Sequence, residues 1–464
     1  MCTGSPPACP TPEGKRMQRR TSILAGLGLG VLLFSAGAFG IIRSVERSTA
    51  STAITLESLD KPGVASALAH LSGETLEQTI TTLQAHLADV PGDYVAWSTL
   101  GLAYVQQAKV TVNAAFYPKA EGVLKRSLAI NQADNFLADA GLAALANARH
   151  DFAAAKQHAL DGLQINPYSD VLYGALSDAE TQLGEYDAAF AAAQRMVDLS
   201  PDTSSLARAS YTWELRGDIE QATALMQHAL DDAPTGANRA FAEFCLGELA
   251  FNSGDANAAL GHYRAALDAS PGDSAALRGK AKAEAALGQF LTATADYATV
   301  VEQTPEPSYL IEYGELLQSL GRTDEAEQQY AVFAATQRLF AANGVEPDAD
   351  ATLFYADHGD PAQALESAER GIRTRPFVVM HDAYAWALHV NGRDAEALAE
   401  ADAALSTGMD NALFQYHRGM IELALGNKAE ARPALERALA INPNFSPLAA
   451  PIAESTVSEL GAAA

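Results

Sequence analysis

The sequence predicts an all-α protein built as an α-solenoid of about ten helix pairs. Runs of β-branched residues with period-two alternation are scarce, so no sheet is expected. Small apolar side chains dominate: hydrophobic residues make up 48% of the chain but aromatic residues only 7%, a composition that lets helices pack closely. A similar segment also recurs about every 34 residues, a period typical of stacked helix pairs.

The recurring segment keeps one register along the chain. DFAAAKQHALDGLQINP (151–167) and DANAALGHYRAALDASP (255–271) each open with an acidic residue and close with proline. The fifth place is alanine in ten units, with steps of 33 to 38 residues: Ala120, Ala155, Ala189, Ala222, Ala259, Ala293, Ala326, Ala364, Ala397 and Ala431. Five residues earlier, eight units carry glycine: Gly184, Gly217, Gly254, Gly288, Gly321, Gly359, Gly392 and Gly426.

Each position in this register has a physical role. The glycine is expected to end the first helix of a pair in the left-handed conformation, which costs glycine little. The alanine is expected where the two helices cross, since a larger side chain would push them apart. The closing proline stops the second helix.

The first unit carries Trp97, Leu100, Gly101 and Tyr104, which match the W-x2-L-G-x2-Y spacing of the tetratricopeptide repeat. Residues 93–445 therefore resemble the tetratricopeptide repeat family, although other units place Ala or Ser where the family prefers Gly in the first helix. The resemblance implies a right-handed superhelix whose concave face binds peptides or partner proteins.

Three irregularities of length stand out, one of which is a step of 37 residues that predicts a longer loop near 232–239. Between Trp97 and Ala120 there are 23 positions where the family motif has 16, so the first helix of the array is expected to project beyond its neighbours. A second long helix is predicted from Asp324 to about Ala342. Both protrusions are candidate contact sites.

An N-terminal hydrophobic helix is expected before the array. Residues 23–42 contain twenty uncharged residues, enough to span a bilayer as a transmembrane anchor. The basic segment 1–22 would stay cytoplasmic, which makes the repeat domain extracytoplasmic on a single-pass membrane protein. Ala36-Gly37-Ala38 also has the form of a signal-peptide cleavage site, so a secreted or periplasmic product is the alternative. Met17 is an alternative start.

The array has flanking segments on both sides. Residues 43–73 are polar and predict a tether, whereas 74–92 are amphipathic and predict a capping helix. Residues 446–464 are expected to form a C-terminal tail.

Charge and motif content argue against nucleic-acid binding and against catalysis. The formal net charge is −26, which repels phosphate backbones and favours solubility or basic partner segments. The sequence shows no metal-ligand spacing, no nucleophile motif and no cofactor fingerprint. We therefore expect a binding protein rather than an enzyme, with no cofactor and no metal.

By the family resemblance, nine side chains are expected to line the concave groove: Tyr211, Phe241, Phe244, Glu248, Phe251, Arg278, Lys282, Trp386 and Tyr416. The aromatic residues from 211 to 251 would form an apolar pocket with a basic edge at Arg278 and Lys282, suited to an acidic or C-terminal group. Packing of these aromatics between adjacent units is the alternative for any one of them.

The predicted function is a membrane-tethered or exported scaffold that binds a protein or peptide in this groove. Self-association is a further possibility for the same surface. The competing interpretations are an architectural spacer of the cell envelope without a defined ligand, and a small-ligand receptor or enzyme.

Overall fold

A computed structural model describes residues 54–59, 65, 68, 71, 73–345 and 348–462. In this part of the chain there are 22 α-helices, two short 3-10 helices and no strand, which confirms the predicted all-α fold. The predicted basic segment 1–22 and hydrophobic segment 23–42 lie outside the described residues, as does most of the predicted tether. None of the described helices combines the length and the apolar character needed to cross a membrane.

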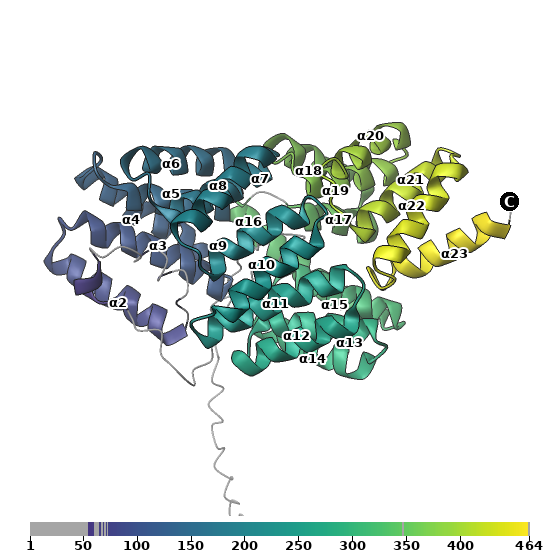
Figure 1. Ribbon diagram of the computed structural model, residues 1–464, viewed down its shortest axis with the longest axis horizontal. Coiled ribbons are helices and arrows are strands. Elements are labelled where there is room, and N and C mark those ends of the chain that lie inside the picture. Colours follow the sequence, from purple (N-terminus) through teal and green to yellow (C-terminus); the bar gives the residue numbers. More distant parts are fainter. Residues whose placement is uncertain are drawn as a thin grey trace, which may run out of the picture.

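Ten consecutive helix pairs form the array (Figure 1). Five pairs make up its first half: α3 (Tyr94–Thr111) with α4 (Tyr117–Ile130), α5 (Phe136–Ala148) with α6 (Phe152–Ile165), α7 (Asp170–Gln182) with α8 (Tyr186–Leu199), α9 (Thr203–Glu214) with α10 (Ile219–Asp231), and α11 (Gly236–Asn252) with α12 (Ala256–Ala269). The second half comprises α13 (Ser274–Ala286) with α14 (Phe290–Gln303), α15 (Pro307–Ser319) with α16 (Thr323–Ala342), α17 (Ala349–His358) with α18 (Pro361–Thr374), α19 (Val378–Val390) with α20 (Asp394–Ala404), and α21 (Ala412–Ala424) with α22 (Lys428–Ile441).

Single helices flank the array. The 3-10 helix η1 (Leu56–Ser58) and α2 (Gly73–Asp89) precede it, and α2 packs against α3. A second 3-10 helix, η2 (Ala114–Phe116), takes up part of the extra length of the first unit. The C-terminal segment that we expected to be a tail contains α23 (Ala449–Ala462), which packs against α22.

The repeated alanines occupy the helix crossings as predicted. Each of the ten is the fourth residue of the second helix in its pair. All ten are buried, with exposed fractions of 0 or 1%. A side chain larger than methyl has no room at these positions, so the period of small residues is a packing requirement.

Seven of the eight repeated glycines adopt the left-handed conformation, with φ between 72° and 86°. Gly359 does not: its φ is −126°. Only two residues separate α17 from α18, and Pro361 at the start of α18 restricts the residue before it to extended conformations. The shorter turn therefore follows a different path.

The array coils so tightly that its turns touch. Three successive turns within pairs meet three successive loops between pairs: Gly184 faces the carbonyl oxygen of Pro376, Gly217 that of Gly408, and Gly254 that of Ile441. A Cβ atom added at these glycines would lie 2.7, 2.3 and 2.6 Å from the respective oxygens. We call these three approaches the closure contacts.

Hydrogen bonds and apolar packing reinforce the closure contacts. The Arg375 guanidinium donates to Gln182 Oε1 over 2.8 Å and lies over the Phe152 ring. The Val378 amide donates to the Tyr186 hydroxyl over 2.9 Å, and the Asn442 side-chain amide donates to the Phe251 carbonyl over 2.9 Å. One core cluster also joins Tyr211 of α9 and Leu215, the residue that follows α9, to side chains of α17–α21.

The long helix α16 has an internal role in the same coil. It reaches Ala342, as predicted from the sequence. Its Phe340, together with Val345 just beyond it, is buried in the core cluster that contains α2, α3 and α4. The extension that we expected to protrude and bind a partner instead packs against the first pair.

The closure contacts predict a difference between two glycine substitutions. Gly217→Ala and Gly288→Ala both place a Cβ on a left-handed residue, at a cost of about 1 kcal/mol. Only at Gly217 does the new Cβ meet a backbone oxygen of a distant loop, since nothing lies within 4 Å at Gly288. We expect Gly217→Ala to lower the melting temperature more and to enlarge the radius of gyration in X-ray scattering. Equal melting temperatures and equal radii would show that the closure contacts contribute nothing to stability.

Candidate functional site

The inner face of the coil encloses a cavity of about 850 Å3. Two sets of first helices line it: α11, α13 and α15 on one side, and α17, α19 and α21 on the other. The segment between α22 and α23 enters between them. The two sides are distant in sequence and face each other because the array coils back on itself.

One side of the cavity carries a charged network, which we call the charged wall: Glu248, Arg278, Lys282 and Glu312. The Arg278 guanidinium donates to Glu312 Oε2 over 2.7 Å and to Glu248 Oε2 over 3.1 Å. The Lys282 ammonium donates to both oxygens of Glu248, over 3.0 and 2.9 Å, and lies 4.4 Å from the centroid of the Phe251 ring. Both cations of the charged wall are therefore paired with carboxylates.

The ion pairs of the charged wall shift the pKa values of its members. Burial alone would raise the pKa of Glu248, but the charges of Lys282 and Arg278 lower it to about 2. Burial and the neighbouring Arg278 lower the pKa of Lys282. Tyr263 also donates its hydroxyl to Glu248, and Tyr297 donates to Glu312 over 3.1 Å. The network is a satisfied set of hydrogen bonds that holds α11, α13 and α15 in register.

The opposite side is an aromatic wall formed by Trp386, Tyr416 and His417. The Trp386 ring stacks on His417 with a centroid separation of 4.3 Å and lies 5.8 Å from Tyr416. The Trp386 indole donates to Asp357 Oδ1 over 2.7 Å. The His417 ring bonds through Nδ1 to the buried carboxylate of Asp382 over 2.9 Å, which fixes the ring orientation.

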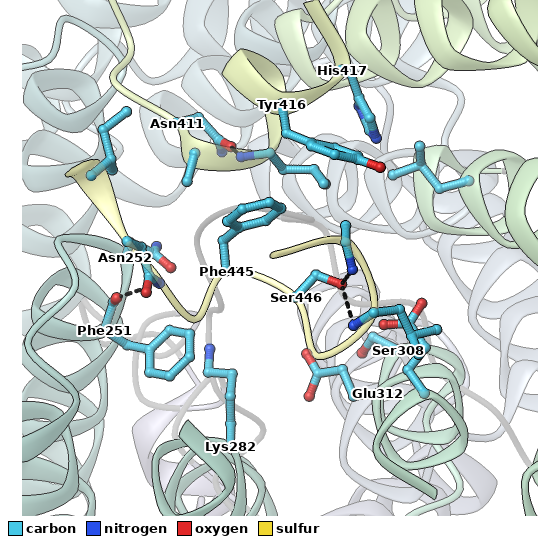
Figure 2. A pocket seen from close by; sticks show the side chains of 18 of the residues that line it. Phe251, Asn252, Lys282, Ser308, Glu312, Asn411, Tyr416, His417, Phe445 and Ser446 are labelled. Carbon is cyan, nitrogen blue, oxygen red and sulfur yellow. Dashed lines mark hydrogen bonds between the residues drawn. The ribbon is translucent and has the colours of Figure 1, made fainter. Parts of the chain in front are cut away.

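Phe445 projects into the cavity between the two walls. Figure 2 shows its ring with Tyr416 on one side and Phe251 and Lys282 on the other. The Phe445 and Tyr416 rings are 5.5 Å apart. Asn442, three residues earlier, is held by its bond to the Phe251 carbonyl. The loop that completes the closure contacts therefore also shapes the cavity.

Six of the nine residues expected in the groove line this cavity: Glu248, Phe251, Arg278, Lys282, Trp386 and Tyr416. The other three do not. Tyr211 belongs to the core between α9 and α17–α21, Phe244 is 2% exposed and packs on Tyr263, and Phe241 is partly buried beside α10. The expected aromatic pocket around these three is filled core, because α9 and α11 pack there against neighbouring helices.

The expected basic edge also differs from the structure. Arg278 and Lys282 lie in the cavity, but Glu248 and Glu312 neutralise them. The same mapping applied one unit later gives Ser308, Ile311, Glu315 and Gln318, which also line the cavity; it misses Glu312, which lies one residue beyond the position equivalent to Arg278. Phe445 lies beyond the last repeat, so the mapping of groove positions does not apply to it.

The fold is that of a helical-repeat protein with an internal cavity on its concave face. Tetratricopeptide repeat models match residues 244–306 and 412–445, which include the second half of α11, the whole of α13 and the whole of α21. These two stretches match tetratricopeptide repeats, and the array has a repeat scaffold fold that is typical of protein–protein interaction.

The chain is similar to several solved structures at low sequence identity. A tetratricopeptide repeat protein from Parabacteroides merdae ATCC 43184 is 19% identical over 56% of this chain and 98% of its own, with a TM-score of 0.33. The Cut9–Hcn1 hetero-tetramer of the APC/C is 13% identical over 87% and 85%, with a TM-score of 0.43. The human IFIT1 dimer with PPP-AAAA is 15% identical over 83% and 92%, with a TM-score of 0.45. No curated protein sequence matches the chain significantly.

Two buried carboxyls at the cavity predict opposite effects on stability. Burial raises the pKa of Glu214 to about 8, from a usual value of 4.5. An acid whose folded pKa is raised destabilises the fold as pH rises from about 4.5 to 8, because the unfolded chain ionises first. We expect Glu214→Gln to raise the free energy of unfolding on the order of 1–3 kcal/mol at pH 8 and to have little effect at pH 4.5.

Glu248→Gln is the matched comparison for Glu214→Gln. The pKa of Glu248 is lowered to about 2, so its ionised form stabilises the fold above its unfolded pKa. This substitution leaves Arg278 and Lys282 with less counter-charge and should lower the melting temperature at pH 8. Melting curves of both variants at pH 4.5 and 8 measure the two effects. A Glu214→Gln effect that does not change with pH would contradict the assignment.

Proposed function

We propose that the protein is a scaffold whose internal cavity binds an exposed segment of a partner protein. The observation that carries the proposal is the convergence of the charged wall and the aromatic wall on one cavity of about 850 Å3. That volume lies in the range of about 300–1,000 Å3 that is usual for ligand sites. It has room for a few side chains but not for a folded domain.

The two walls offer complementary ways of holding a peptide. Trp386 and Tyr416 present ring surface, and aromatic side chains are frequent anchors at protein interfaces. Exposed residues at the rim, such as Ile452 with 46% exposure, extend the apolar surface toward solvent. The bond from Asn442 to the Phe251 carbonyl fixes the segment that carries Phe445, so a ligand would meet a surface that is already formed.

Site-specific photo-crosslinking in the native cell tests the proposal. We expect benzoylphenylalanine at position 445, in the cavity, to capture one dominant protein. The matched probe is position 290, a 44% exposed phenylalanine at the start of the outer helix α14. Identical crosslinks from both positions would contradict a binding role for the cavity and favour the architectural spacer.

A blocking variant strengthens the crosslinking experiment. Ala440→Trp adds bulk at the cavity lining without removing a packed side chain, since Ala440 is exposed. It should abolish the crosslink from position 445. Ala331→Trp, at an exposed position of α16, is the control and should leave the crosslink intact.

We further propose that residues 23–42 tether the array to a membrane or direct its export. The support is the uncharged stretch of twenty residues after a basic segment. We expect the full chain to stay in the membrane fraction after alkaline carbonate extraction and its repeats to be digested by protease added from the extracytoplasmic side. A released chain whose N-terminus follows Ala38 would establish signal cleavage instead, and protease resistance in intact cells would contradict export.

A further inference from the structure

The cavity has more acidic than basic groups. Seven acidic and three basic side chains line it. Each of the three basic groups is paired: Arg278 and Lys282 with carboxylates of the charged wall, and Arg437 with Asp410. Within the described part of the chain, the lining therefore offers no cation without a carboxylate partner.

Two of the remaining carboxylates, Asp357 and Glu315, line the cavity from the neighbouring first helices α17 and α15. Asp357 is at the end of α17, where it accepts a hydrogen bond from the Trp386 indole. Glu315 is on α15, where its Oε1 lies 3.2 Å from His358 Nε2. Burial raises the pKa of Glu315, and the charge of Asp357 raises it further. A positive charge placed between these two groups would relieve their repulsion.

Aromatic rings surround this pair of carboxylates. Trp386 is bonded to Asp357, and Tyr330 stacks on His358 with a centroid separation of 4.6 Å. Tyr416, which lies 5.8 Å from Trp386, also lines the cavity; burial and then the charge of Asp357 raise its pKa. Ring faces and carboxylates together favour a guanidinium or an ammonium group, because both attract cations.

We propose that the cavity recognises a basic side chain, Arg or Lys, in an extended segment of the partner protein, with Asp357 and Glu315 as its counter-charges. The inference rests on the proposed function and adds the chemistry of the partner. The occupant follows from charge complementarity: the cavity lacks a spare cation and the chain carries a net charge of −26, which attracts basic segments and repels acidic ones. The partner's apolar residues would then lie against Phe445 and Tyr416.

Selection from a randomised peptide library tests this proposal. The full chain, purified in a mild detergent, is immobilised and panned against random twelve-residue peptides, and the bound peptides are sequenced. We expect enrichment of Arg or Lys beside aromatic or aliphatic residues. The double variant Asp357→Asn with Glu315→Gln should bind the selected peptides about tenfold more weakly, as expected for the loss of a charge pair in a cavity.

Matched variants separate recognition from folding. Asparagine and glutamine keep the hydrogen bonds to Trp386 and His358, so the double variant should melt at the wild-type temperature or above it. Glu302→Gln with Glu327→Gln removes the same charge from exposed positions of α14 and α16 and should leave peptide affinity unchanged. Asp357→Lys should reverse the selection toward acidic peptides.

The outcomes distinguish this inference from the proposed function. If neutral or acidic peptides are enriched instead, and Ala440→Trp abolishes their binding, recognition of a basic side chain is refuted but the cavity is still a binding site. Equal weakening by the control double variant would show that only the overall charge matters, and would also overturn it. If Ala440→Trp does not weaken binding of the selected peptides, both the inference and the proposed function are contradicted.

Discussion

The contact between successive turns of the coil is the constraint on which the rest of this structure depends. An open array of helix pairs presents its first helices to solvent along a shallow groove. Here the loops after α18, α20 and α22 lie against the turns after α7, α9 and α11. That contact brings the charged wall opposite the aromatic wall and converts a groove into a cavity. It also buries Arg375, which is stabilised by a glutamine, a histidine and an aromatic ring rather than by a direct carboxylate.

Much of the fold was predictable from sequence because the packing rule repeats. Each helix crossing requires a methyl group, and the end of each first helix requires a left-handed residue. Both requirements are local, so alanine and glycine recur in the sequence at a fixed spacing. Gly359 was mispredicted because the turn between α17 and α18 has only two residues, the second of which, Asp360, is held extended by Pro361. The role of the α16 extension was mispredicted because its partner is the first helix pair, which no pattern within α16 reveals.

The candidate site was only partly predictable for the same reason. Helix positions indicate which side chains turn inward, and they placed Glu248, Arg278 and Trp386 at the cavity. They carry no information about what lies opposite. Tyr211 turns inward as well, but at its level the two turns of the coil are in contact, so it is core. Arg278 and Lys282 suggested an acidic ligand until their pairing with Glu248 and Glu312 was visible.

The closure contacts also change how such a chain folds and unfolds. In an open repeat array each unit touches only its neighbours, so stability spreads along the chain and the ends fray independently. Here Val378 is bonded to Tyr186, 192 residues away, and Asn442 to Phe251, 191 residues away. Units in the first half therefore reach their final stability only after the second half has been synthesised and docked. We therefore expect the array to unfold more cooperatively than an open one, so that loss of its last pairs also destabilises the middle of the chain.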